Sequence, residues 1–159
     1  MNIFLTRIFL ILSLLLGGIV YSQKEETVRW LDFEQLEDSL RVHPKKVFID
    51  FYADWCGPCI RMQKEVFTDP KIIHRLNKEY YAVKMDVESR DTIVFGNQKF
   101  VNERMNRRNP VHQIPMLMGR QKNKPFSVPA LVFMDKNFDP TGRYFQYLNV
   151  EQLSDILLQ

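Results

Sequence analysis

The chain has 159 residues, of which 45% are hydrophobic, and its 22 Lys and Arg against 19 Asp and Glu give a formal net charge of +3. A balance so close to neutral argues against nucleic acid as a partner. The length suits one domain that buries its own core without disulfide staples. Neither length nor composition decides the fold class, which we infer from the order of the predicted elements.

The chain begins with a pattern typical of a secretory signal peptide. Arg7 is followed by the apolar run IFLILSLLLGGIV and then by the small or polar residues YSQ. An uncleaved anchor helix is the alternative, but the run is shorter than the ~18 apolar residues that a membrane span needs. We therefore predict a signal peptide at 1–22, a mature chain at 23–159 and export to a bacterial periplasm.

Helical and extended patterns alternate through the mature chain. The run KKVFIDFYA is rich in β-branched and aromatic residues, which favours a central strand covered on both faces. Asp32, Asp69 and Asn149 each precede a helical pattern as N-caps. The predicted elements are, in chain order, a strand at 28–31, a helix at 32–43, a strand at 45–53, helices after Cys56 and at 69–78, a strand at 80–87, a helix near 97–107, strands at 127–135 and 143–148, and a helix at 150–158. This order predicts an α/β fold, one sheet with helices on both faces.

The segment at about 90–126, which we call the insert, is rich in Pro, Met and basic residues. We interpret Met105, Met116 and Met118 together with Phe126 as core residues, because Met fills irregular gaps readily. A surface that selects partners is the alternative interpretation, since the insert leads directly into the strand that opens with Pro129.

The three histidines, His43, His74 and His112, are scattered along the chain, and we expect them on the surface. A copper site formed by His112 with the Met116 and Met118 thioethers is an alternative that rests on ligand softness. A zinc site normally takes four ligands, and the sequence has no second Cys pair, so we predict neither a metal nor a cofactor.

The only two cysteines, Cys56 and Cys59, lie in the stretch DWCGPC. A disulfide between residues three apart closes too small a loop to stabilise the fold, so we do not expect a structural staple. Between a strand and a helix, Cys56 would face the unsatisfied amides of the first turn, which lowers a thiol pKa. Gly57 permits the tight transition and Pro58 is tolerated there. We infer that Cys56 exchanges disulfides and Cys59 resolves the mixed disulfide, although two inert buried thiols are the alternative.

WCGPC after a hydrophobic strand resembles the active site of thioredoxin, and the likeness covers residues 28–159 except the insert. The resemblance implies a thioredoxin fold, a central mixed sheet flanked by helices with an insertion before the strand of the cis-proline. The roles that it implies are a buried proton-transfer acid at Asp50, an indole before the nucleophile at Trp55, a cis-proline at Pro129, backbone contact to substrate at Val128, and a loop glycine near the site at Gly142.

Three of these roles have a plainer alternative. Trp55 is otherwise a core residue, an interpretation that is compatible with the role. Asp50 is otherwise a salt-bridged residue facing solvent, whereas burial would raise its pKa. Pro129 is otherwise a trans proline on an edge strand. Lys64 stands where thioredoxins often place a helix-kinking proline, and Val128 replaces the common Ile or Thr, which leaves the direction of electron flow open.

The leading hypothesis from the sequence is an exported protein-disulfide reductase, a monomer that contributes to redox homeostasis. Its expected partners are exported proteins with disulfides and a membrane thiol electron donor, because an oxidising compartment supplies no reductant. An oxidase or isomerase on the same fold, and a non-catalytic folding or assembly module, are the alternatives.

Overall fold

The computed structural model describes residues 27–158, so the predicted signal peptide at 1–22 lies outside the described part. Its centre is a five-stranded sheet in the order β1-β3-β2-β6-β7. The strands are β1 (Trp30–Leu31), β2 (Lys46–Tyr52), β3 (Tyr80–Asp86), β6 (Ala130–Met134) and β7 (Pro140–Tyr144). The first three run parallel, whereas β6 is antiparallel to β2 and β7 to β6. The predicted mixed sheet is therefore confirmed.

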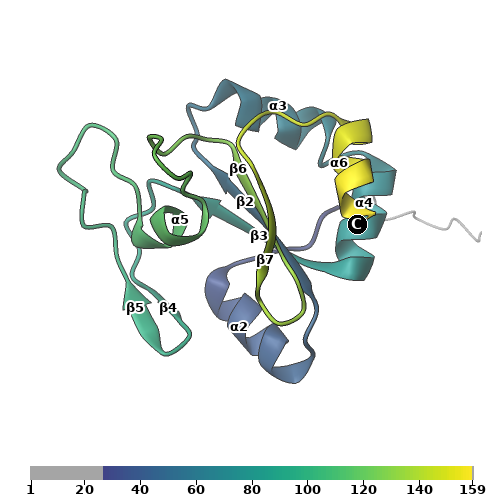
Figure 1. Ribbon diagram of the computed structural model, residues 1–159, viewed down its shortest axis with the longest axis horizontal. Coiled ribbons are helices and arrows are strands. Elements are labelled where there is room, and N and C mark those ends of the chain that lie inside the picture. The colour runs from purple at the N-terminus through teal and green to yellow at the C-terminus, as the bar shows by residue number, and fades with distance from the viewer. Residues whose placement is uncertain (1–26, 159) are drawn as a thin grey trace, which may run out of the picture.

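Helices cover both faces of this sheet (Figure 1), so the architecture is a three-layer α/β/α arrangement. The helices are α2 (Phe33–Val42), α3 (Gly57–Glu65), α4 (Pro70–Glu79), α5 (Gln113–Met118) and α6 (Val150–Leu157). Along β2, Val47, Ile49 and Phe51 pack with α2 and α5 on one face, while Phe48 packs with α3, α4 and α6 on the other. Burial on both faces explains why this strand is continuously apolar.

The predicted N-caps are confirmed. The side chains of Asp32 and Asn149 each accept a hydrogen bond from the third helical amide, and a Gln at that position bonds back to the cap. Asp69 accepts from the amides of Lys71 and Ile72. These caps satisfy amides that the helix itself leaves free, and so they fix where each helix begins.

The insert contains a β-hairpin, so the helix predicted near 97–107 is wrong. Strands β4 (Ile93–Phe95) and β5 (Gln98–Phe100) pair antiparallel and are joined by Gly96 and Asn97, both with φ of 59°. Two consecutive residues with positive φ form the turn that best matches the twist of a hairpin, and Gly and Asn adopt it most readily. The local turn chemistry prevailed over the helical spacing.

The insert is joined to the domain by buried contacts. Ile114 of α5 is fully buried in the core beside β2, and Asn102, 3% exposed, donates to the Ser89 carbonyl at 3.0 Å. His112 is 0% exposed, so its predicted surface position is wrong. Met118 packs against the core as predicted, whereas Met105 is exposed.

Candidate active site

The cysteine pair lies where β2 gives way to α3. After β2 ends at Tyr52, the Cys56 amide donates to the Ala53 carbonyl at 3.0 Å, which closes a turn. Cys56 is the N-cap of α3, and its Sγ accepts the Cys59 amide at 3.2 Å. An amide and a helix N-terminus aimed at this sulfur favour its thiolate once the pair is reduced.

Cys56 and Cys59 are joined in a disulfide, with their Cα atoms 5.2 Å apart. Both are buried, whereas Gly57 and Pro58 between them are exposed. The exposed side of this turn is therefore the one formed by Gly57 and Pro58.

Asp50 is buried in the middle of β2, where it pairs with Lys84 of β3 and Leu131 of β6. Strand alternation places its side chain on the same face as Phe48, the face that α3 covers. It is 2% exposed, and its Oδ2 has no hydrogen-bond partner among the described residues. Burial raises the pKa of this carboxyl to about 7, and the Lys84 charge partly opposes the rise. Near neutral pH Asp50 can therefore both accept and release a proton.

Lys84 shares the Asp50 face of the sheet and sits among aromatic rings. Its Nζ lies 4.5 Å from the centre of the Tyr52 ring and 6.0 Å from that of Trp30. The rings hold the ammonium group by cation–π attraction. The positive charge of Lys84 therefore lies near Asp50 and acts on its pKa, although the two side chains do not form an ion pair.

Trp55, just before Cys56, is 64% exposed. Its indole Nε1–H donates to Glu88 Oε1 at 3.0 Å. Trp55 and Glu88 line an open pocket together with Arg108 and Asn109 of the insert. Trp55 was predicted from the sequence, whereas Glu88, Arg108 and Asn109 were not, because no local pattern shows that residues so far along the chain lie beside Trp55.

The Val128–Pro129 peptide bond is cis, as predicted, and the trans alternative is wrong. Pro129 is buried, and Val128 is half-buried against the core cluster that contains Cys56 and Cys59. The structure therefore places the cysteine pair and the residue before the proline in one core cluster, although they lie far apart in the sequence.

The profile of the Thioredoxin-like domain family matches residues 33–159. The chain belongs to this family. It is 32% identical over 71 residues to the thiol:disulfide interchange protein DsbD of Campylobacter jejuni, a match that covers 45% of this chain and 12% of the relative. The chain thus spans only a small part of that longer protein.

Solved structures show the same fold. A thioredoxin from Thermus thermophilus superposes with a TM-score of 0.59 at 16% identity, covering 84% of this chain and 86% of the other. The C-terminal domain of Neisseria meningitidis DsbD in the reduced form gives a TM-score of 0.51 at 16% identity, covering 79% and 90%. The thioredoxin fold expected from WCGPC is therefore confirmed.

Within residues 27–158, no group of three or more His, Cys, Asp or Glu side chains is placed to hold a metal ion. The copper alternative fails on His112. Its Nδ1 accepts the Ile114 amide at 3.2 Å, and its Nε2 lies 3.2 Å from the Asp91 carbonyl. In the same residues, no helix is long and apolar enough to cross a membrane.

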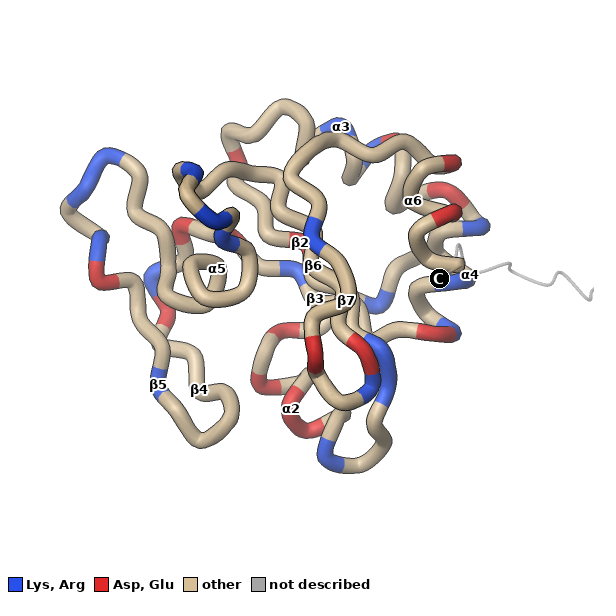
Figure 2. The backbone as a smooth tube through the Cα atoms, viewed as in Figure 1, with Lys and Arg blue, Asp and Glu red and all other residues tan. Residues whose placement is uncertain are grey.

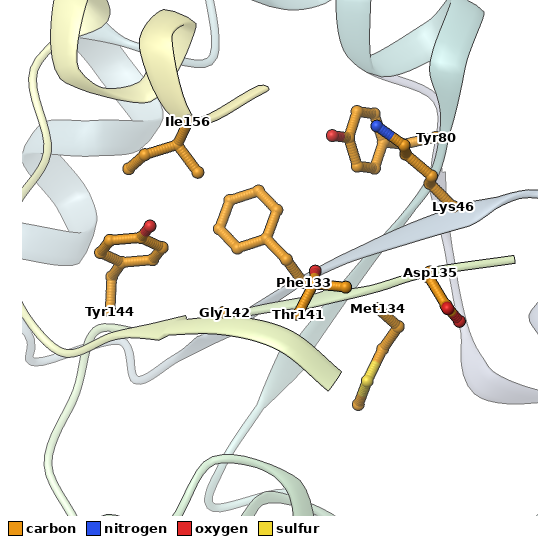
Figure 3. Close-up of a pocket in the computed structure, with 9 residues that line it drawn as sticks. All are labelled: Lys46, Tyr80, Phe133, Met134, Asp135, Thr141, Gly142, Tyr144 and Ile156. Atoms are coloured by element: carbon orange, nitrogen blue, oxygen red, sulfur yellow. The ribbon is translucent and has the colours of Figure 1, made fainter. Parts of the chain in front are cut away.

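The resemblance implied that Gly142 lies in a loop near the site, and this prediction is wrong. It pairs with Phe133 inside β7 and lines a cavity of about 250 Å³ (Figure 3). Lys46, the first residue of β2, lines the same cavity. Since Cys56 follows the other end of β2, this cavity lies at the sheet end away from the disulfide.

Proposed function

We propose that this thioredoxin-like protein is an exported protein-disulfide reductase that acts on proteins of the periplasm. Two observations together carry the proposal: the disulfide at the first turn of α3 packs in one core cluster with Val128, and the unpartnered Asp50 lies on the sheet face that α3 covers. A nucleophile, a proton acceptor and a backbone edge for substrate are the parts that dithiol exchange needs.

In the reduced protein, the Cys56 thiolate attacks a substrate disulfide. One substrate sulfur leaves as a thiolate, and a mixed disulfide joins Cys56 to the other. The Asp50 carboxylate accepts the proton of the Cys59 thiol, and the Cys59 sulfur then attacks Cys56. The mixed disulfide breaks, the second substrate thiolate leaves, and two electrons have passed from the protein to the substrate.

The substrate strand would lie along Val128, whose backbone precedes the cis-proline beside the cysteine turn. An extended peptide would add hydrogen bonds to the backbone at Val128, which would position the attacked sulfur without a side-chain requirement. Trp55, Gly57, Pro58 and Pro129 complete this surface.

We propose that electrons flow from this protein to its substrates. Gly57 and Pro58 support this direction, because WCGPC resembles the thioredoxin sequence. Thioredoxin potentials lie at about −270 mV, the reducing end of the scale. An exported reductase must be recharged, and an oxidising compartment supplies no reductant. We therefore include a membrane thiol donor that relays electrons from the cytosol. The interchange proteins among its relatives support exchange chemistry and leave the direction to experiment.

The test is the equilibrium potential of Cys56–Cys59 against glutathione, measured together with insulin reduction. We expect a potential of about −270 mV and an insulin-reducing activity that Cys56→Ser abolishes. A potential well above about −200 mV would instead assign an oxidase or isomerase. If cells that carry Cys56→Ser in place of the wild-type protein show no defect, the protein would instead act as a non-catalytic assembly module. A Cys59→Ser variant, which cannot resolve mixed disulfides, would capture the natural substrates and the donor.

A further inference from the structure

Charge is unevenly distributed between the insert and the rest of the chain. The insert at 90–126 has eight Lys and Arg against two Asp and Glu, a net charge of +6, whereas the remaining residues have fourteen against seventeen, a net charge of −3. Figure 2 shows the basic segments of the insert on the side of β4, β5 and α5, and acidic segments around α2. The chain thus concentrates its positive charge on one structural unit.

A groove runs through this basic unit. Its volume is about 460 Å³, and it lies between β5, the loop that follows β5, and α5. Phe100, Val111, Met116 and Leu117 give it apolar surface, and Leu117 is 66% exposed. The cations that line it are Lys99, Arg104 and Arg120.

The three cations make no ion pair within the described residues. The one carboxylate in the groove, Glu103, accepts a hydrogen bond from Gln113 Nε2 at 2.7 Å. Unpaired cations around apolar side chains are complementary to a segment that carries both acidic and apolar residues.

The insert borders the active site on two sides. Arg108 and Asn109, in the loop after the groove residue Arg104, share a pocket with Trp55. At the end of α5, a Cβ on Gly119 would lie 3.4 Å from the Cβ of Ala130, the residue that follows the cis-proline. In Figure 1 the insert accordingly stands beside the β2 and β6 ends that carry the cysteines and the proline. A protein bound to Cys56 therefore meets the insert nearby.

We propose that the groove of the insert binds an acidic, apolar segment of the protein substrate and thereby selects which disulfide reaches Cys56. This inference rests on the proposed reductase function. A protein segment fits better than nucleic acid or an anionic membrane, because the groove is partly apolar and the rest of the chain is net negative, which would repel an extended polyanion.

The binding test needs no redox step. A fluorescein-labelled, cysteine-free peptide of alternating Glu and Leu is titrated into the oxidised full chain and followed by anisotropy, with a Lys-Leu peptide as its counterpart. We expect binding of the acidic peptide only, and weakening of that binding as salt increases. Arg104→Glu with Arg120→Glu should weaken it by roughly tenfold or more.

The matched control is Lys71→Glu with Lys78→Glu, two exposed residues of α4 that change net charge equally. This pair should leave binding unchanged. Equal affinity for the two peptides, an equal loss in both double variants, or displacement of the peptide by phosphatidylglycerol vesicles would overturn the proposal. Substitutions are preferable to deleting 95–123, because deletion would remove the fully buried Ile114.

A second readout separates this inference from the proposed function. Each peptide is given one cysteine, which is joined to 5-thio-2-nitrobenzoate in a mixed disulfide. The rate at which the reduced protein releases 5-thio-2-nitrobenzoate is then measured. We expect the acidic peptide to react roughly tenfold faster, an advantage that the Arg104→Glu, Arg120→Glu variant loses while a small neutral disulfide reacts as before. If neither peptide is reduced but the acidic one still binds, the proposed reductase function is wrong, whereas the proposal that the groove binds acidic segments is retained. If both are reduced at equal rates, the reductase function stands and the inference fails.

Discussion

The active-site end of the sheet and the insert each bury one titratable side chain, and the two side chains differ in whether their polar atoms have hydrogen-bond partners. Asp50 has an oxygen without any partner among the described residues, whereas both ring nitrogens of His112 are engaged. A buried polar atom without a partner costs stability, and such costs are characteristic of functional groups. The difference supports the proposal that β2 carries the chemistry, while the contacts of His112 maintain the shape of the insert.

The two regions also differ in what holds them together. Around the disulfide, β2 lies between two strands and two apolar clusters. The hairpin of the insert packs Ile93 and Phe95 against the core, but exposed polar contacts add to this packing, with Glu34 and Glu37 of α2 accepting the amides of Val94 and Gly96 at 3.3 and 3.0 Å. Exposed polar contacts of this kind tolerate substitution better than a close-packed interior.

The largest expected effect comes from the core under β2. Phe48 is fully buried and meets the rings of Trp30, Phe67 and Phe133. Phe48→Ala should lower the free energy of unfolding by about 3–5 kcal/mol, because it removes apolar contacts and leaves a cavity. Leu117→Ala, at an exposed site of the insert, should change it by less than about 0.5 kcal/mol. Urea denaturation followed by circular dichroism measures both, and similar losses would contradict the division between the regions.

The sheet was predictable from sequence where local and long-range requirements agree. KKVFIDFYA reads as a buried strand because both of its faces are covered, and the caps at Asp32, Asp69 and Asn149 satisfy the amides of their own helices. The cysteine turn was predictable for the same reason, since its chemistry depends on the helix that begins there.

The insert was predicted poorly because its structure depends on partners far away in sequence. The pair Gly96–Asn97 is a hairpin signal that was overlooked beside a helical spacing. His112 is buried because the Asp91 and Val87 carbonyls and the Ile114 amide bond to it, and no local pattern shows these contacts. The approach of Arg108 to Trp55 is invisible for the same reason.

The second prediction concerns the unpartnered carboxyl. The folded-state pKa of Asp50, about 7, lies above the ordinary 3.8, so the folded protein holds a proton that the unfolded chain has lost between these values. Stability from this group is complete below about pH 3.8 and is lost as the pH rises toward 7. Asp50→Asn should therefore be more stable than the wild type above pH 7, by on the order of 4 kcal/mol.

The same variant should slow the resolution of the mixed disulfide by Cys59 and remove the dependence of that step on pH near 7, because Asn cannot accept the proton. Denaturation from pH 4 to 9 and stopped-flow insulin reduction measure the two effects. A constant stability difference over this range would show that Asp50 is not the group that titrates, and an unchanged rate of resolution would remove its catalytic role.

The smallest expected effect lies in the insert, at His112. Its ring must be neutral, because Nδ1 accepts the Ile114 amide, and burial lowers its pKa below the ordinary 6.5 although Asp91 nearby opposes this. The stability that His112 contributes is thus complete above about pH 6.5 and is lost as the pH falls through the folded-state pKa. His112→Ala should cost about 1–2 kcal/mol at pH 7.5, since it removes an N-cap and a buried contact.

His112→Asn is the matched variant, because an amide oxygen can cap α5 without titrating. It should recover much of the loss and make stability less dependent on pH between 5 and 7. If the cap only maintains the groove, His112→Ala should also weaken binding of the acidic peptide while the potential of Cys56–Cys59 stays constant. A shift in that potential would mean that the insert acts on the disulfide itself, and the separation between chemistry in β2 and shape in the insert would fail.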